Sequence, residues 1–392
     1  MRRSSLYCGF ILAAFGAAGL VVLHTGALAS LSSHSKEGSS NDRHLRSFEI
    51  VPLEAVSETS SNASIGDLNG DGHPDIVLVK GRHWPLKSLI LLGDGQGHFR
   101  PGPPLPSQAV RSYSAPLADM TKSGHLDIVL GNDAPDPKMV LLNDGTGKFT
   151  LGGTYGDPHW STRNVAVGDL NGDGYPDIAV ANRGMPSYVC FNDGKLHFSC
   201  RQLEDSPSAA TVAIADINGD GANDVIYACR DLCQSLVYLN DGKGNFTRRE
   251  AWGPAKSSTR AIAVADFDGD GHLDIAACHE RLGCFVYLND GKGNFAGGIQ
   301  FQGPEPMPYS MIAADLNRTH RPDILVGYVD APGRIYFNDG TGRKYKSVPF
   351  GDGKGTIYGM AAGDLDGDGW TDVVVARSGA PCFVMFNRPP KE

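Results

Sequence analysis

The sequence lacks the features that would assign its 392 residues to a common enzyme class or to nucleic-acid binding. It has no basic run suited to nucleic acid, no nucleophile elbow and no histidine-rich metal signature. Helix signals are scarce, whereas glycine is abundant at 50 residues. We therefore expect no nucleic-acid partner, a β-rich fold, and no function that depends on a distinctive catalytic motif.

Acidic residues, in contrast, are concentrated in a repeated nine-residue loop. The loop has Asp at position 1, Asp or Asn at position 3, Asp at position 5, Gly at position 6 and Asp at position 9. Calcium accepts about six to eight oxygen ligands from such flexible acidic loops, whereas magnesium demands a tighter octahedron. The expected calcium ligands are Asp67, Asn69, Asp71 and Asp75; Asp169, Asn171, Asp173 and Asp177; Asp216, Asn218, Asp220 and Asp224; Asp266, Asp268, Asp270 and Asp274; and Asp364, Asp366, Asp368 and Asp372.

The five intact loops predict about five Ca²⁺ ions per chain. Two degenerate copies, at 119–127 and 315–323, lack the carboxylate at position 5, so we expect them to be empty. A metal-free acidic turn would explain a single loop, but it is an improbable explanation of five loops at regular spacing. An EF-hand is excluded because position 12 of the first loop is Leu78 rather than Glu. The formal net charge of −9 is mostly the charge of these loops and says little about partners.

The loops mark a repeat of about 50 residues, whose first aspartates are at positions 67, 119, 169, 216, 266, 315 and 364. In each unit a short strand precedes the loop and a continuous apolar strand follows it, as at 76–79. After a variable turn, a third strand ends in an Asn-Asp-Gly hairpin that leads into a fourth strand. Four short antiparallel strands at this period predict an all-β fold, a seven-bladed β-propeller with four-stranded blades.

The two ends of the repeat region predict how the ring closes. The last unit stops at Asn387, after its third strand, and therefore has no fourth strand of its own. The segment Ser47–Val51 is a strand candidate that no preceding unit uses. Pairing of this N-terminal strand with the last blade would close the ring and protect both edges. We place the propeller at 47–387 and a C-terminal tail at 388–392.

The N-terminus resembles a secretory signal, so we expect a secreted protein, extracellular or periplasmic. Residues 1–29 combine Arg2 and Arg3, an apolar run at 10–23, and a small-residue cleavage site at 27–29. A polar linker follows at 30–46. The alternative is an uncleaved membrane anchor, although the apolar run is shorter than the roughly 18–20 residues that a span needs.

Six cysteines form three pairs that each flank a turn within one unit. Local disulfides in an oxidising compartment would suit these separations. Zinc is the competing interpretation, but it needs four convergent ligands and the pairs belong to different units. Cys382 is the odd cysteine, expected to be buried or free. The expected pairs are Cys190 with Cys200, Cys229 with Cys233, and Cys278 with Cys284.

On these motifs the chain resembles FG-GAP and VCBS repeat proteins, whose best-known relative is the propeller of the integrin α-subunit. The Asp-x-Asp/Asn-x-Asp-Gly-x-x-Asp calcium motif of that family matches residues 67–75, 169–177, 216–224, 266–274 and 364–372. The resemblance covers about residues 47–387 and implies a calcium-binding propeller. Asn-Asp-Gly hairpins replace the Phe-Gly and Gly-Ala-Pro elements of integrins, and no other integrin domain is present.

The calcium loops join first and second strands, so they share one rim, and the opposite rim carries the turns that vary between units. Variable turns on a rigid scaffold are common binding sites. Candidate ligand-binding residues there are Arg82, Trp84, Trp160 and Arg163, an Arg and aromatic mixture suited to sugars or carboxylated glycans. Ordinary solvated loops are the alternative.

Three functions remain open for this scaffold. We favour a calcium-binding module that binds a glycan or a protein, in adhesion or recognition. The alternative is a carbohydrate-active enzyme of the polysaccharide lyase or sugar dehydratase type, and the third possibility is a structural role. The fold does not decide among them.

Overall fold

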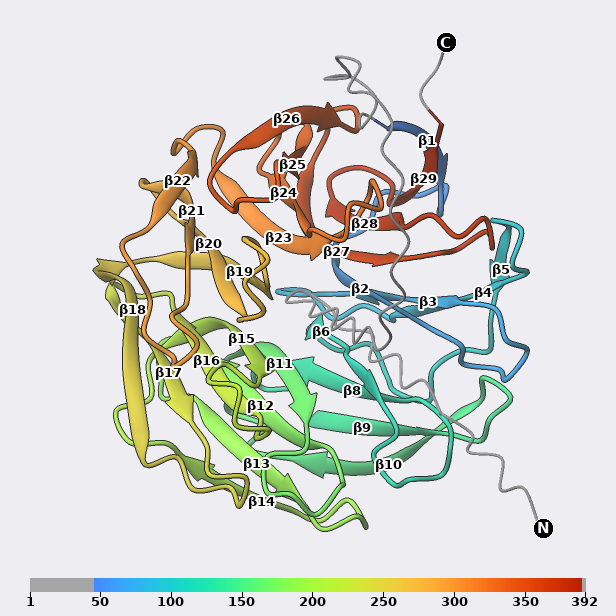
Figure 1. The fold of residues 1–392 in the computed structure, drawn as a ribbon. Helices are drawn as coiled ribbons and strands as arrows, with labels where there is room; N and C mark the ends of the chain where they lie inside the picture. Colours follow the sequence, from blue (N-terminus) through green and yellow to red (C-terminus); the bar gives the residue numbers. More distant parts are fainter. Residues whose placement is uncertain (1–45, 390–392) are drawn as a thin grey trace, which may run out of the picture.

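The computed structural model describes residues 46–389 as seven antiparallel β-sheets arranged in a ring (Figure 1). The predicted signal segment 1–29 and nearly all of the linker 30–46 lie outside the described residues. No helix in the described part of the chain is long and apolar enough to cross a membrane. The predicted seven-bladed all-β propeller is therefore confirmed.

Each sheet is one blade, and its strands follow one another outward from the central axis. Blade 1 contains β2 (Ser60–Gly66), β3 (Asp75–Lys80), β4 (Leu89–Gly93) and β5 (Phe99–Pro101). Blade 2 contains β6 (Ser112–Ser114), β7 (Leu117–Ala118), β8 (Asp127–Asn132), β9 (Lys138–Asn143) and β10 (Phe149–Tyr155). Blade 3 contains β11 (Thr162–Gly168), β12 (Asp177–Asn182), β13 (Tyr188–Asn192) and β14 (Phe198–Gln202). Blade 4 contains β15 (Ala209–Ala215), β16 (Asp224–Cys229), β17 (Cys233–Leu239) and β18 (Arg248–Ser257).

The remaining blades follow the same order, and the last one takes its outer strand from the N-terminus. Blade 5 contains β19 (Thr259–Ala265), β20 (Asp274–His279), β21 (Gly283–Tyr287) and β22 (Ile299–Gln302). Blade 6 contains β23 (Pro308–Ala314), β24 (Asp323–Tyr328), β25 (Gly333–Asn338) and β26 (Tyr345–Phe350). Blade 7 contains β27 (Thr356–Gly363), β28 (Asp372–Ser378), β29 (Phe383–Arg388) and β1 (Ser47–Pro52).

The ring closes as the sequence predicts. β1 pairs antiparallel with β29, from Ser47 opposite Arg388 to Pro52 opposite Phe383. The two ends of the ring thereby meet in one blade, and β1 covers the outer edge of β29. In blade 2 the inner strand is divided into β6 and β7 around Pro116, which has no N–H to donate to the ladder.

The hydrophobic core lies between neighbouring blades, which explains why the second strands are apolar on both faces. Every residue of β3, β8, β12, β16, β20 and β24 is buried. One core cluster, for example, joins Phe267 and Ala276 of blade 5 to Met311 and Ile324 of blade 6. The ring is thus a sequence of blade-to-blade interfaces rather than a single central core.

Three disulfides link the predicted pairs, Cys190 with Cys200, Cys229 with Cys233, and Cys278 with Cys284. Cys382 is a free, buried cysteine. Each bridge stays within one blade, so the bridges support individual sheets rather than the ring. Disulfides persist in oxidising compartments, and the three bridges indicate such an environment.

A buried aspartate at position 9 of the loop connects three parts of every blade. Its Oδ2 accepts the N–H of loop position 2, and its Oδ1 accepts an N–H at or just beyond the end of the third strand. In blade 3, Asp177 accepts from Leu170 at 2.8 Å and from Asn192 at 2.8 Å. The same two bonds occur in all seven blades, and all seven aspartates are fully buried. We call this residue the latch aspartate.

The asparagine that opens each Asn-Asp-Gly hairpin connects neighbouring blades. In blade 5, Asn289 Nδ2 donates to the carbonyl of Ile217 in blade 4 at 2.7 Å and to that of Leu273 in its own blade at 2.9 Å. Equivalent asparagines join five further pairs of blades. Blade 1 has Gly93 in this position, so the junction between blades 7 and 1 lacks the asparagine bond. The hairpin signal in the sequence therefore marks an inter-blade contact as well as a turn.

We predict that Asn289→Ala destabilises the protein by about 1–3 kcal/mol, because the buried carbonyl of Ile217 and the partly buried carbonyl of Leu273 lose their donor. The matched control is Asn294→Ala in the same hairpin, where the exposed Asn294 side chain bonds only within the loop and to Arg248. Denaturant unfolding of both variants measures the difference. Equal losses in the two variants would contradict the inter-blade role.

Candidate functional site

The direction of the strands places two different sets of residues at the two rims of the ring. Every inner strand runs toward the acidic loop that follows it, so the seven loops share one rim, the loop rim. The beginnings of the inner strands and the turns after the second strands lie at the opposite rim. We call this the variable rim.

In the intact loops the first aspartate organises the turn. Asp169 accepts the N–H of Gly172 at 2.7 Å and that of Gly174 at 2.8 Å, and Asp173 accepts that of Tyr175 at 2.8 Å. Carboxylate oxygens of Asp266, Asp268 and Asp274 lie within 4.8 Å of one another. Asp364, Asp366 and Asp368 converge in the same way. Clusters of carboxylate oxygens on a glycine turn are a donor set that fits calcium.

Burial raises the pKa values of the latch aspartates. Burial raises the pKa of Asp177 to about 7, and the N–H donors of Asn192 and Leu170 oppose that rise. The latch pattern recurs in the degenerate loops, where burial raises the pKa of Asp323 to about 7 as well. Position 9 therefore has a structural role in every blade, whether or not a loop carries the other metal ligands.

The two degenerate loops keep the backbone shape of the intact ones. Position 4 is Gly172 at φ 76° in blade 3, and the degenerate loops place Lys122 at φ 60° and Arg318 at φ 55° there. Both side chains extend to the next loop along the ring. Lys122 lies 3.9 Å from the ring centroid of Tyr175, and Arg318 lies 4.0 Å from that of Trp370. These loops thus bring a cation beside an intact acidic loop instead of adding a carboxylate.

Blade 7 has a further cation at its acidic loop. Arg388 Nη1 lies 2.5 Å from Asp366 and 3.5 Å from Asp368. A guanidinium on two of the expected ligands competes with a metal ion for the same oxygens. Of the five intact loops, we expect this one to bind calcium most weakly.

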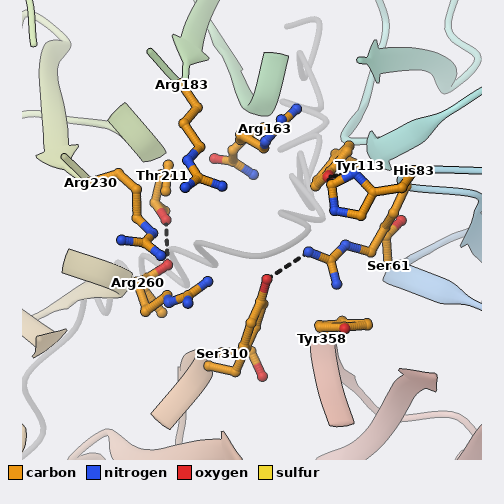
Figure 2. Close-up of a pocket in the computed structure, with 15 residues that line it drawn as sticks. Ser61, His83, Tyr113, Arg163, Arg183, Thr211, Arg230, Arg260, Ser310 and Tyr358 are labelled. Atoms are coloured by element: carbon orange, nitrogen blue, oxygen red, sulfur yellow. Dashed lines mark hydrogen bonds between the residues drawn. The ribbon is translucent and has the colours of Figure 1, made fainter. Parts of the chain in front are cut away.

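The variable rim has a pocket on the central axis, formed by a β-bulge that recurs in every inner strand. In blade 3 the register shifts between Thr162 and Asn164, so Arg163 is the extra residue. A bulge redirects one side chain and is common beside functional sites. The seven bulge residues all line one cavity of about 90 Å³, shown in part in Figure 2; they are Ser61, Tyr113, Arg163, Ala210, Arg260, Tyr309 and Tyr358.

Residues that follow the second strands complete this axial pocket and make it strongly basic. Arg82 and His83 come after β3, Arg183 after β12 and Arg230 after β16. With Arg163 and Arg260 from the bulges, five arginines line the pocket and no Asp or Glu does. Figure 2 shows the side chains of Arg183 and Arg260 directed toward the central space from different blades.

Three carboxylates behind the lining pair with four of these arginines. Arg163 Nη1 lies 2.6 Å from Asp133, and Arg183 Nε lies 3.6 Å from Asp231. Glu280 accepts two bonds from Arg230, at 2.8 and 3.1 Å, and also pairs with Arg260. Five guanidinium groups thus face three carboxylates, which leaves an excess of two positive charges.

Of the five pocket arginines, Arg82 is the one for which the described chain supplies no carboxylate partner. It donates to the hydroxyl of Tyr309 at 2.6 Å, and its guanidinium lies 3.7 Å from the ring centroid of Tyr358 and 5.2 Å from that of Tyr113. Arg82 is only 9% exposed. Cation–π contacts partly replace the water that burial removes.

His83 and Tyr113 meet at the edge of the same pocket. The Tyr113 hydroxyl lies 3.3 Å from the His83 ring nitrogens. Burial lowers the pKa of His83, and the charges of Arg82 and Arg163 lower it further, so the imidazole is neutral at pH 7. Burial raises the pKa of Tyr113, against the opposing effect of the two arginines.

The four predicted ligand-binding residues separate into two groups. Arg82 and Arg163 line the axial pocket. Trp84 lies on the variable rim and is 71% exposed. Trp160 stacks on Tyr188, with 4.2 Å between the two ring centroids, and does not line the pocket. Sequence reasoning missed Arg260, although every bulge residue stands six positions before the first Asp of its loop. This fixed position in the repeat is the sequence signal that could have identified Arg260.

The variable rim also carries most of the exposed large apolar side chains. Seven such residues occur in the described chain, and five lie in turns or strand starts of this rim. Isolated exposed apolar residues are ordinary on a protein surface, but here most of those in the described chain share one rim. The five residues are Val56, Trp84, Leu89, Leu232 and Leu282.

Comparison with known proteins identifies the repeat. A family model described as an FG-GAP-like repeat matches residues 67–130, 119–180, 169–227, 216–277 and 315–375. No curated protein matches the chain.

Among solved structures, the fold is similar to BBS1N in complex with ARL6DN. In a mercury-soaked crystal the TM-score is 0.59 at 11% identity, with 89% of this chain and 98% of that chain covered. In a lead-soaked crystal the TM-score is 0.55 at 12% identity, with 88% and 98% covered. At this identity the similarity concerns the fold alone.

We predict that Glu280→Gln destabilises the protein by about 2 kcal/mol, because Arg230 and Arg260 lose their shared charge partner. Glu250→Gln is the matched control: Glu250 pairs with Arg248 on the outer surface, where the change should stay within about 0.5 kcal/mol. Thermal melts of both variants measure the difference. A Glu280→Gln variant as stable as wild type would show that Arg230 and Arg260 do not need the Glu280 carboxylate to lie close together.

Proposed function

The chain belongs to the FG-GAP-like repeat family, and on that premise we propose that it is a secreted, calcium-binding module that binds a partner protein with its variable rim. The observation that carries this proposal is the joint location of the axial pocket and five exposed apolar residues on that rim. The loop rim repeats nearly unchanged, whereas the variable rim differs from blade to blade, as expected of a recognition surface.

A protein partner accounts for the rim better than a neutral glycan does. Leucine and valine offer no flat aromatic face on which a sugar ring stacks, and three of the five exposed apolar residues are leucines. The structure of BBS1N in complex with ARL6DN, a propeller of similar fold, is in line with a protein partner. Secretion is supported by the three disulfides and by the signal-like N-terminus.

In this proposal calcium supports the loop rim. The ligands would be the carboxylates and asparagines of the five intact loops, and the bound ions would cancel the repulsion between aspartates a few ångströms apart. The latch aspartates would hold the same loops to the blades from inside. The ions would thus stiffen the rim opposite the recognition surface.

A second candidate, an eliminating polysaccharide lyase, is favoured by one observation. A neutral His83 touches Tyr113 beside arginines that could neutralise the carboxylate of a uronate sugar. Such a pair can remove a proton and protonate a leaving group. Incubation with acidic polysaccharides distinguishes this candidate, because elimination produces new ultraviolet absorbance, which Tyr113→Phe would abolish.

We predict about five bound calcium ions per chain, with none in blades 2 and 6, measured by elemental analysis of the purified protein. Chelation should lower the melting temperature, because each site contributes about 2.7 kcal/mol at a hundredfold excess over Kd. Asp173→Ala should remove one ion, whereas the control Asp119→Ala, in a degenerate loop, should leave the ion count unchanged. Two or fewer ions, or an unchanged melt in chelator, would contradict the calcium proposal.

The rim proposal is tested with a displayed library of random peptides and, in parallel, a glycan array, both on calcium-loaded protein. We expect peptides to be enriched and their binding to be lost in Leu232→Ser. The control is Leu151→Ser on β10, at 58% exposure against 67% for Leu232. If the enriched peptides bind both variants equally, the binding site is not on the variable rim. If only glycans bind, the proposed protein partner is wrong and the ligand is a glycan.

A further inference from the structure

We propose that the axial pocket is a socket for paired carboxylates on an acidic segment of the partner protein. This inference rests on the proposed function, since it names the chemistry of the group that enters the rim. The segment would place adjacent Asp or Glu side chains in the pocket and its apolar side chains on the surrounding turns.

The excess positive charge of the axial pocket favours an anionic ligand. The chain as a whole is acidic, with a formal net charge of −9, yet its axial pocket has two more guanidinium groups than carboxylates. Like charges held together in a partly buried space repel one another, and their proximity destabilises the free protein. A ligand with two negative charges would balance the excess.

Arg82 is a buried guanidinium to which the described chain supplies no carboxylate. Burying a charge is costly unless it is paired and hydrogen-bonded. The guanidinium has five N–H donors, and the described chain supplies Arg82 with one acceptor, the Tyr309 hydroxyl, and with aromatic faces. An incoming carboxylate would provide both the missing charge and further acceptors, in the planar geometry that matches a guanidinium.

The wall of the pocket already contains an example of this arrangement. Glu280 reaches Arg230 through both of its oxygens and also pairs with Arg260. One carboxylate is therefore shared by two arginines from adjacent blades. A partner carboxylate entering along the axis would meet Arg82 from blade 1 in a comparable position.

The size of the pocket limits what can enter. The cavity of about 90 Å³ is far smaller than the roughly 300–1,000 Å³ of pockets that enclose a whole small-molecule ligand. It admits the ends of side chains rather than a complete sugar chain. The rest of the ligand must lie on the rim, whose exposed side chains include five large apolar ones that favour a polypeptide.

The test uses the calcium-loaded full chain and isothermal titration with a short peptide that has two adjacent glutamates beside a leucine. The reference peptide has glutamines in place of the glutamates. We expect the glutamate peptide to bind and the glutamine peptide not to, with an affinity that falls as salt rises. Arg82→Gln should weaken binding about tenfold or more.

Arg281→Gln is the matched control, because it removes the same charge from a turn of the same rim without touching the pocket. We expect it to change affinity by about twofold or less, as for a rim charge. Glu280→Gln should bind the glutamate peptide more tightly than wild type, because it adds to the excess positive charge. The tighter binding expected of Glu280→Gln tests the proposal even if Arg82→Gln fails to fold.

Three results would overturn the socket. Equal binding of the two peptides would remove the carboxylate requirement, and equal loss in Arg281→Gln and Arg82→Gln would reduce the effect to general electrostatics. Binding of a uronate oligosaccharide but of neither peptide would assign the pocket to a glycan. If Leu232→Ser still abolishes peptide binding while charge has no effect, the socket fails and the rim proposal survives.

Discussion

Every blade depends on one buried carboxylate, the latch aspartate at position 9 of its loop. It joins the start of the second strand to the loop before it and to the end of the third strand, through two N–H donors. Burial raises its pKa, and those donors are what makes a carboxylate tolerable inside the fold. Because the bond pattern recurs in the degenerate loops of blades 2 and 6, the latch bonds themselves do not depend on the other metal ligands.

Local and repeated signals were sufficient to predict the fold. The spacing of the loops predicted the number of blades, and the spare segment at Ser47 together with the missing fourth strand after Asn387 predicted the closure that β1 and β29 make. The three disulfides were predictable because each pair flanks a single turn. The calcium ligands stay a prediction, for which the convergent oxygens are the supporting geometry.

The axial pocket was predictable only in part, because it combines residues that are far apart in the sequence. Glu280 pairs with Arg230 from the preceding blade, and Arg82 of blade 1 meets Tyr309 of blade 6. No spacing rule within one repeat reports such contacts. Trp160 illustrates the opposite case: a large aromatic beside an arginine in sequence is typical of a ligand site, but here it packs on Tyr188.

A repeated backbone can nevertheless form a pocket with two different sides. The bulge places one side chain per blade on the axis, and the latch and asparagine bonds that fix the blade involve other positions, so the bulge residue can vary without disturbing the ring. Tyrosines occupy it in blades 2, 6 and 7, around Arg82 of blade 1, whereas the other four arginines come from blades 3, 4 and 5. The result is an aromatic side that holds one arginine away from carboxylates and an arginine side that is largely neutralised by its own wall. One of the two unbalanced charges is therefore Arg82, which is 9% exposed and lies among the tyrosines, and a ligand charge would gain from pairing with it there.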